Sequence, residues 1–441
     1  MTLRWTLGSI AAGLGGHLAG DGAAVVRDVA VDSRLVGHAT LFVALHGEHA
    51  DGHDHAGAAL AAGAVGVVVD RTIAAMPRIE VADTATALRD LAAMRRSELS
   101  VPVVAVTGST GKTSTKDLLA AALPGAAASP RSYNNEVGVP LTILGAQEAR
   151  YLVVEVGSRG AGHITWLMPA VIPDVAIITN LGVVHLETFG TVEALVEAKW
   201  ELVAGLGDAG TAVLPSDEPR LRRAHRGKTL TFGRDPAADV AVTDIVLDAR
   251  GLPRFTLVTP AGEVRVGLQL AGEHQAINAA AATAAGLAVG VDLDTLAAGL
   301  ERAHGSQWRM EIHRGRFTVV NDAYNANPDS VMAALRTVAG LPGRHVAVLG
   351  KMAELGTVEA EEHRRIGAEA RRLGYAVVVT VGHDPGFAEG AGDIAHAATD
   401  PAAALDMLTG VLRRGDVVLV KASRAIGLEG LAEQLRQGAG A

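Results

Sequence analysis

The amino-acid sequence predicts a mixed α/β protein with three domains built mainly on parallel sheets. Short apolar runs alternate with Ala-rich helical stretches along the whole chain, which is the pattern of repeated βαβ units. The chain has 441 residues, 49% of them hydrophobic, and this is enough for several separate cores. We expect domains over about 1–99, 100–308 and 309–441.

Apolar runs that end beside Gly, Asp, Asn or Glu predict the strands of these sheets. They cover 65–69, 103–106, 151–154, 175–179, 212–214, 317–320, 345–349, 376–381 and 417–420. The alternating pattern within 232–270 predicts further, antiparallel strands at the edge of the central domain. Because ligands collect at the carboxyl ends of parallel strands, the polar residues after these runs are candidate site residues.

Helices are predicted between the strands, and two of them help to set the domain boundaries. A charged helix over 88–99 runs into Ser100-Val101-Pro102, where the first boundary falls. An Ala-rich helix over 278–290 precedes the polar stretch 302–309, where the second boundary falls. A further helix, over 115–122, follows a glycine turn.

Composition excludes several classes of function. The chain has no cysteine, so disulfides, thiolate nucleophiles, Cys-ligated zinc and iron–sulfur clusters are excluded, and oxygen and imidazole remain as metal ligands. A net charge of −9 argues against broad binding of nucleic acid but allows a small anionic ligand in a pocket. Since no apolar run approaches the roughly 18–20 residues that span a bilayer, and the start of the chain lacks a signal-peptide pattern, we expect a cytoplasmic protein without membrane insertion.

The strongest motif is a glycine loop between an apolar strand and a helix. It consists of Gly108, Ser109, Thr110, Gly111, Lys112, Thr113 and Ser114. In such a loop, backbone N–H groups and the helix N-terminus bind a polyphosphate, the lysine reaches the terminal phosphates, and the threonine can ligate Mg²⁺. The generic motif has glycine where Val106 stands, but the strand–loop–helix context favours nucleotide binding over a plain turn.

Three residues are candidates for the metal site of this nucleotide. Glu155 ends an apolar strand next to the loop, and a carboxylate oxygen is the ligand that Mg²⁺ prefers. His185 and Lys199, each taken alone, are typical of a satisfied histidine and a solvated helix cation. Lys199 is of interest because the chain uses arginine for most of its basic residues. Only six of the 39 are lysine, at positions 112, 116, 199, 228, 351 and 421.

Polar clusters follow apolar runs elsewhere in the chain too. Asn278 opens the Ala-rich helix, Arg309 follows an irregular stretch, and 321–328 is rich in Asn around a Tyr and a Pro. Such a cluster can also be a simple turn, because Asn and Pro favour turns for backbone reasons. The same alternative applies to 31–34 and 51–53 near the N-terminus.

Taken together, these motifs resemble the Mur ligase family, the ATP-dependent amide ligases of peptidoglycan precursor synthesis. The resemblance covers nearly the whole chain in order. The matching segments are 32–34, 41–47, 51–53, 107–114, 133–142, 322–330, 350–356 and 421–424, with His363. It implies a UDP-binding first domain, a P-loop ATPase-like central domain and a Rossmann-like C-terminal domain. The family's ATP loop also lacks the first generic glycine.

The resemblance also assigns roles to the candidate residues. Lys112, Glu155, His185 and Lys199 would be catalytic, and Thr113, Glu155, His185 and Lys199 would bind two Mg²⁺ ions, with Lys199 carbamylated by CO₂. Asn278, Arg309 and Asp322 would hold adenine, phosphate and ribose of ATP. Ser33 and Arg34 would contact UDP, and the other substrate contacts would be Asn134, Asn135, Tyr324, Asn325 and Asn327.

The first-domain segments resemble a domain shared by the branches that add the third residue and the terminal dipeptide. The segment 322–330 resembles specifically the branch that adds D-alanyl-D-alanine to a UDP-N-acetylmuramoyl-tripeptide through an acyl phosphate. A monomer is expected. Two alternatives stay open: a sibling ligase, of the third-residue-adding or folylpolyglutamate synthase type, and a P-loop ATPase that drives a conformational change. Phosphate release that needs both an acid and an amine substrate would distinguish a ligase from the ATPase.

Overall fold

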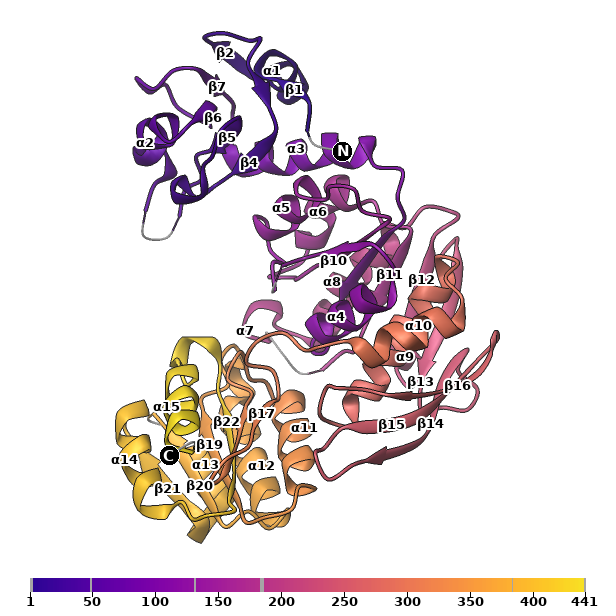
Figure 1. The fold of residues 1–441 in the computed structure, drawn as a ribbon, viewed down its shortest axis with the longest axis vertical. Coiled ribbons are helices and arrows are strands. Elements are labelled where there is room, and N and C mark those ends of the chain that lie inside the picture. The colour runs from indigo at the N-terminus through magenta and orange to yellow at the C-terminus, as the bar shows by residue number, and fades with distance from the viewer. Residues whose placement is uncertain (1–2, 48–49, 131, 183–185, 383, 440–441) are drawn as a thin grey trace.

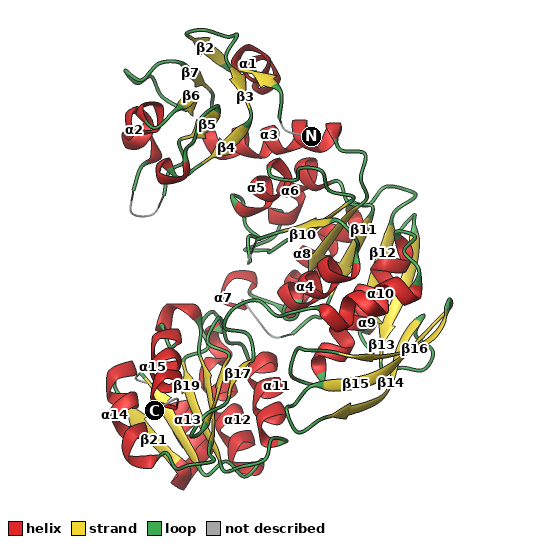
Figure 2. Cartoon of the chain, viewed as in Figure 1, coloured by secondary structure: helices red, strands yellow, loops and turns green. Residues whose placement is uncertain are grey.

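The computed structural model describes residues 3–47, 50–130, 132–182, 186–382 and 384–439. It confirms the mixed α/β fold with three domains, which follow one another along an arc with the N-terminal and C-terminal parts at its two ends (Figure 1). Helices flank each of the three larger sheets (Figure 2). Within the described residues, no helix is both long and apolar enough to cross a membrane.

The N-terminal part contains a five-stranded sheet in the order β2-β7-β6-β5-β4, beside a short β1-β3 ribbon. The strands are β1 (Trp5–Thr6), β2 (His17–Ala19), β3 (Val25–Val26), β4 (Asp28–Ala30), β5 (Thr40–Val43), β6 (Ala64–Val69) and β7 (Arg78–Glu80). The helices are α1 (Leu7–Leu14), α2 (Ala56–Ala61) and α3 (Thr84–Glu98), with short 3₁₀ helices η1 (Ser33–Leu35) and η2 (Gly52–His55). Strands β4 to β7 are parallel, so their carboxyl ends share one edge.

The central part is built on a nine-stranded sheet in the order β16-β15-β14-β13-β12-β11-β8-β10-β9. Its strands are β8 (Val103–Thr107), β9 (Ala126–Ala128), β10 (Tyr151–Glu155), β11 (Val175–Ile178), β12 (Thr211–Pro215), β13 (Lys228–Gly233), β14 (Val240–Leu247), β15 (Pro253–Thr259) and β16 (Gly262–Gly267). Its helices are α4 (Lys112–Ala122), α5 (Gly138–Leu144), α6 (His163–Val171), α7 (Leu186–Phe189), α8 (Val192–Ala204), α9 (His274–Ala288) and α10 (Leu293–Arg302). The pairs β14-β15 and β15-β16 are antiparallel, as predicted for this edge.

The C-terminal part has a six-stranded sheet in the order β17-β18-β22-β19-β20-β21, parallel except for β17. The strands are β17 (Glu311–His313), β18 (Thr318–Asn321), β19 (His345–Gly350), β20 (Val377–Val381), β21 (Ala395–Ala398) and β22 (Val417–Lys421). The helices are α11 (Pro328–Ala339), α12 (Glu359–Arg372), α13 (Pro385–Ala391), α14 (Pro401–Val411) and α15 (Glu429–Ala439).

The predicted elements are found in the structure, with shifted helix starts. Each of the nine predicted strands is present to within a residue or two, and the predicted helices begin three or four residues early, at Thr84, Lys112 and His274. For α3 the cause is a cap, because the Asp83 side chain accepts the backbone N–H of Thr86. For α4 it is Gly111, whose φ of 78° lets the chain enter the helix directly from the loop.

The N-terminal and central parts share one apolar core. Leu88 and Leu91 of α3 belong to the same buried cluster as Ile143 of α5 and Ile164 of α6. The Arg96 side chain adds hydrogen bonds to the carbonyls of residues 171 and 172, at 3.1 and 2.8 Å. The first sheet is therefore fixed to the central part through α3 (Figure 1).

The C-terminal part has a core on each face of its sheet, one of which also includes Ala271 of the central part, and a short segment connects the two parts. In this segment Ser306 donates to a carboxylate oxygen of Asp117 on α4 through its backbone N–H (3.1 Å) and its hydroxyl (2.6 Å). Helix α4, which follows the glycine loop, is thus hydrogen-bonded to the segment that connects the two parts.

Candidate active site

The glycine loop lies at the carboxyl end of β8, in the middle of the central sheet, and two glycines fix its shape. Gly108 has a φ of 145°, and a Cβ there would collide with the Thr179 hydroxyl. Gly111 has a φ of 78°, and a Cβ there would lie 2.6 Å from Oδ1 of Asn278. Both positions therefore require glycine, for conformation and for space.

The loop rests on the neighbouring strand end. Asn180, just after β11, accepts the backbone N–H of Ser109 at its carbonyl (3.1 Å) and that of Thr110 at its side-chain oxygen (2.8 Å). Its amide group also donates to the Thr110 hydroxyl, and the Ser109 hydroxyl donates to the carbonyl of Gly182 (3.1 Å). The sequence prediction gave Asn180 no role, although its place directly after an apolar strand was the signal that could have found it.

Lys112 is the first residue of α4 and folds back over the loop. Its Nζ donates to the carbonyls of Gly108 (2.7 Å) and Ser109 (3.3 Å). Burial lowers the pKa of this amine, and the nearby Arg309 lowers it too, while Glu155 acts in the opposite direction. The lysine has no ion pair of its own among the described residues, so its charge is available to an anion that enters the loop.

Glu155 ends β10 in the strand position next to the loop. Its Oε1 accepts the side-chain amide of Asn134 (2.7 Å), and its backbone N–H donates to the Ser129 hydroxyl (3.0 Å). Its Oε2 is buried and has no hydrogen-bond partner within the described part of the chain. A buried carboxylate oxygen without a donor is costly unless a cation binds it, so this oxygen fits a Mg²⁺ ligand.

Thr113 provides a second oxygen in this region, because its buried hydroxyl lies 3.1 Å from that of Ser132. The Ser132 hydroxyl also accepts a guanidinium N–H of Arg309 (3.2 Å). Ser132 therefore connects the glycine loop to the segment that leads into the C-terminal part. The sequence prediction did not include this serine.

Lys199 lies on α8 and is only 1% exposed. Burial lowers the pKa of its amine well below the ordinary value, the charge of Lys112 lowers it further, and Glu201 opposes this. The structure records no hydrogen bond or ion pair from its Nζ to any described residue. A neutral amine in a buried place fits the chemistry of carbamylation. His185, predicted as its neighbour at the metal site, lies outside the described residues.

The residues predicted to bind the nucleotide lie on three separate segments of the chain. Asn278 of α9 stands over Gly111 and donates to Oε1 of Gln275 (3.0 Å). Arg309 stacks on the Tyr324 ring, with 4.2 Å between the guanidinium carbon and the ring centre. Asn278 thus lies against the loop, and Arg309 reaches it through Ser132.

Asp322, just after β18, is held by two groups. Its Oδ1 accepts the backbone N–H of Met310 (3.1 Å), and its Oδ2 pairs with the buried Nζ of Lys421 (2.6 Å). Lys421 also donates to the carbonyl of Asn325 (2.8 Å). The sequence prediction gave Lys421 no role.

Several residues predicted to bind substrate use their side chains to stabilise local turns. Asn135 accepts the backbone N–H of Gly138 (2.8 Å), Asn325 accepts that of Ala326 (2.9 Å), and Asn327 caps α11 by accepting that of Ser330 (2.9 Å). The turn alternative is thus present in the structure, and a substrate role for these three stays a prediction.

Ser33 and Arg34 lie in η1 of the N-terminal part. The Arg34 guanidinium pairs with Asp32 (2.6 Å) and its side chain is 86% exposed. This arginine lowers the pKa of the Asp32 carboxyl to about 2, chiefly by hydrogen bonding. An exposed guanidinium that is oriented but not buried remains free to bind an anionic group.

Three family models match consecutive parts of the chain. They are the Mur ligase family, catalytic domain (residues 25–96), the Mur ligase middle domain (106–286) and the Mur ligase, glutamate ligase domain (308–424). Together these matches cover well over half of the sequence.

Relatives match over nearly the full length. The UDP-N-acetylmuramoyl-tripeptide–D-alanyl-D-alanine ligase of Mycobacterium tuberculosis is 37% identical, over 93% of this chain and 92% of that protein. A MurF crystal structure from Acinetobacter baumannii superposes with a TM-score of 0.92, at 31% identity and 99% coverage of both chains. The MurF ligase of Thermotoga maritima, solved in complex with ADP, gives a TM-score of 0.85 at 29% identity, covering 93% of this chain and 97% of that one. The glycine loop, the buried carboxylate beside it and these full-length matches together show that the chain belongs to the Mur ligase family.

Proposed function

We propose that the protein is an ATP-dependent ligase that joins D-alanyl-D-alanine to the terminal carboxylate of UDP-N-acetylmuramoyl-tripeptide. The observation that carries this proposal is the proximity of the loop lysine Lys112 to two buried groups: the Glu155 carboxylate, one oxygen of which has no partner among the described residues, and the amine of Lys199. Relatives named for this reaction match along the whole chain, which supports this substrate pair over that of a sibling ligase. A monomer in the cytoplasm is part of the proposal.

The reaction needs a leaving group on the acid, because a carboxylate and an amine do not condense in water. A carboxylate oxygen attacks the γ-phosphorus of ATP, the bond to the bridging oxygen breaks, and ADP leaves with its electron pair. The amine of the dipeptide then attacks the acyl carbon, loses a proton, and phosphate leaves from the tetrahedral intermediate. The protein's task is to position the reactants and to offset charge. Lys112 offsets charge on the transferred phosphoryl group.

The donor set around the loop fits Mg²⁺. Thr113 and Glu155 would hold one ion, and Glu155, His185 and carbamylated Lys199 a second, as the family resemblance implies. When bound, Mg²⁺ neutralises phosphate charge. The carbamate of Lys199 would form by attack of its neutral amine on CO₂ with loss of a proton, which turns a repelling cation into an anion. Asn134, by its hydrogen bond, orients the Glu155 carboxylate.

On the nucleotide, Asn278 would hold the adenine, Arg309 a phosphate and Asp322 the ribose. Arg309 is oriented for this by Ser132 and by the Tyr324 ring. Asp322 is oriented by Lys421, whose buried Nζ pairs with its Oδ2.

An assay of ADP release tests the proposed reaction. UDP-muramoyl tripeptides carrying diaminopimelate or lysine as the third residue are supplied with ATP, with and without D-alanyl-D-alanine. We expect sustained ADP release only when a tripeptide and the dipeptide are both present. Release with a single amino acid in place of the dipeptide would instead assign a sibling ligase, and release without either substrate would assign an ATPase of the switch type.

A second prediction concerns the UDP group. If Arg34 binds the diphosphate, Arg34→Ala should raise the KM for the UDP-linked tripeptide about 10- to 100-fold and leave the KM for ATP nearly unchanged. Stability should hardly change, because an exposed ion pair contributes little. Steady-state kinetics with each substrate varied in turn measure this. The matched control is Arg27→Ala, an exposed arginine of the same domain. A similar rise in both KM values would indicate a folding role for Arg34.

A further inference from the structure

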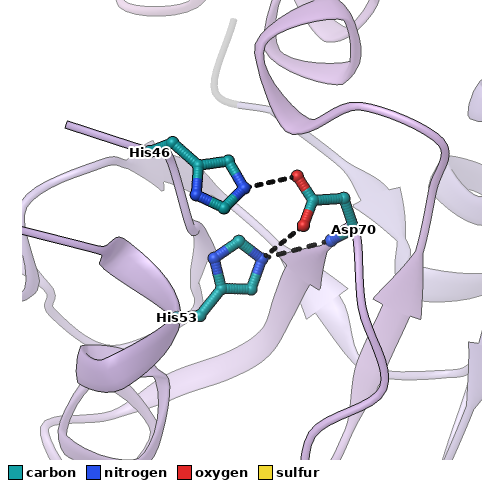
Figure 3. Close-up of side chains that lie close together, drawn as sticks. All are labelled: His46, His53 and Asp70. Carbon is teal, nitrogen blue, oxygen red and sulfur yellow. Dashed lines mark hydrogen bonds and ion pairs between the residues drawn. The ribbon is translucent and has the colours of Figure 1, made fainter.

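Two histidines and an aspartate meet at the carboxyl edge of the N-terminal sheet, away from the glycine loop (Figure 3). His46 follows β5, His53 lies in η2, and Asp70 comes directly after β6. Nε2 of His46 lies 2.9 Å from Oδ2 of Asp70, and Nε2 of His53 lies 3.1 Å from its Oδ1. One donor atom from each of the three residues lies within 4.8 Å of the others.

Asp51 orients both imidazoles from the opposite side. Its Oδ1 lies 2.6 Å from Nδ1 of His53, and its Oδ2 lies 3.4 Å from Nδ1 of His46. The backbone N–H of His53 and the Arg71 guanidinium hold the pKa of Asp51 well below its usual range, so it stays an anion. Its hydrogen bond with His53 favours the proton on Nδ1 of that ring and turns Nε2 toward Asp70, which is how metal-binding histidines are commonly oriented.

Both imidazoles meet the same carboxylate through Nε2. Nε2 of His46 is hydrogen-bonded to Oδ2 of Asp70, and Nε2 of His53 accepts the backbone N–H of Asp70. No lysine or arginine among the described residues forms an ion pair with Asp70. The two rings are stacked with centres 4.9 Å apart, so both nitrogens lie on the same side of the carboxylate. A single divalent cation between the three side chains would replace these contacts with bonds to both nitrogens and to the carboxylate.

We propose that His46, His53 and Asp70 bind a divalent transition metal of the zinc class. Two imidazoles with one carboxylate suit Zn²⁺ better than Mg²⁺ or Ca²⁺, which prefer all-oxygen sites. The distances of 2.9 and 3.1 Å lie near the about 3.3 Å that separates two ligands of a tetrahedral ion with bonds of about 2.0–2.1 Å. The backbone N–H of Asp70 also reaches Nε2 of His53 (3.2 Å), and the ion would displace this contact.

The exposed fractions of the three side chains also favour an ion-binding site. The His53 side chain is fully buried and that of Asp70 is 15% exposed, whereas that of His46 is 54% exposed. His53 and Asp70 therefore form the buried side of the site. His46 is the accessible ligand, and an ion can enter from its side. Three protein ligands leave the fourth position of a tetrahedral ion to water or to another ligand.

A second group of similar residues, Glu359, His363 and Asp384, does not have these properties. It has one histidine in place of two, and Nδ1 of that histidine faces Asp384. Lys351 already supplies a positive charge 2.8 Å from Glu359. This group therefore serves as an internal comparison.

The test measures binding of Zn²⁺ to the full chain, by competition with a chromophoric chelator and by equilibrium dialysis. We expect His46→Ala to bind one equivalent fewer than the unchanged protein, and Asp70→Asn to weaken that equivalent at least about tenfold. His46 is chosen over His53 because its side chain is half exposed, so the variant keeps its fold; circular dichroism without metal verifies this. The matched control is His55→Ala, a nearby exposed histidine outside the group.

Replacing Zn²⁺ by Co²⁺ gives a second readout. A site with two imidazoles and one carboxylate yields the intense visible absorption of four-coordinate Co²⁺, and we expect His46→Ala to remove it and His55→Ala to keep it. Equal zinc stoichiometry and affinity in the unchanged protein and His46→Ala would overturn the proposal. An equal loss in His55→Ala would overturn it too, because it would show nonspecific binding to surface histidines.

Discussion

Lys112→Ala is expected to lower ligase kcat/KM at least about a thousandfold, a loss of about 4 kcal/mol in transition-state stabilisation. The reason is that Nζ is the cation held over the glycine loop, where the γ-phosphoryl group of ATP would develop charge during transfer. Its only described hydrogen bonds go to carbonyls of its own loop, so the fold should persist without it. Ligase rates together with the midpoint of thermal unfolding measure both effects.

The control for this prediction is Lys228→Ala, since Lys228 is an exposed lysine at the start of β13. It should keep normal activity. If Lys112→Ala retained activity within tenfold of the unchanged protein, the assignment of the loop to ATP would be wrong. A variant that lost activity only because it unfolded would show a lowered midpoint, which the same samples reveal.

Lys199→Arg is expected to be as inactive as Lys199→Ala. Lys199 is 1% exposed, and burial lowers the pKa of its amine, which favours the neutral form that can add CO₂. Arginine keeps its positive charge and cannot form a carbamate under these conditions, and it would place that charge near Lys112. Steady-state ligase activity in the presence of bicarbonate compares the two variants.

Chemical rescue separates the carbamate from other roles of Lys199. A small carboxylate at high concentration, such as formate or acetate, should restore part of the rate of Lys199→Ala by supplying the missing anion, and should not restore Lys199→Arg. Lys228→Arg is the matched exchange at an exposed lysine and should be fully active. An active Lys199→Arg enzyme would contradict the carbamate and would indicate an ordinary helix cation.

The sequence predicted most parallel strands of the central and C-terminal sheets because these strands are buried on both faces, but of the N-terminal sheet it predicted only β6. β8, for example, is buried at every residue, so it appears in the sequence as an unbroken apolar run. Strands β17 and β21 were not predicted, because both lie at a sheet edge and are short and mostly partly exposed, which leaves no such run. Helix starts were displaced because caps and loop glycines, rather than apolar periodicity, determine them.

The candidate site was predictable where a polar residue or loop directly follows a strand in the sequence, as with Glu155 and the loop after β8. It was not predictable where the contact joins distant parts of the chain. Ser132 meets Arg309 across 177 residues, and Lys421 meets Asp322 across 99. The first pair depends on how the central and C-terminal parts pack together, and the second on which strands of the C-terminal sheet are neighbours. Local spacing encodes neither.

The apolar core shared by the N-terminal and central parts has a consequence for how the chain unfolds. Because α3 and the helices α5 and α6 bury their apolar faces against each other, neither part can open without exposing the surface of its neighbour to water. Most of the first half of the chain is therefore expected to unfold as one cooperative unit. In a central fragment that began at residue 100, the faces of α5 and α6 that normally pack against α3 would be exposed to water. We expect this apolar patch to cause aggregation.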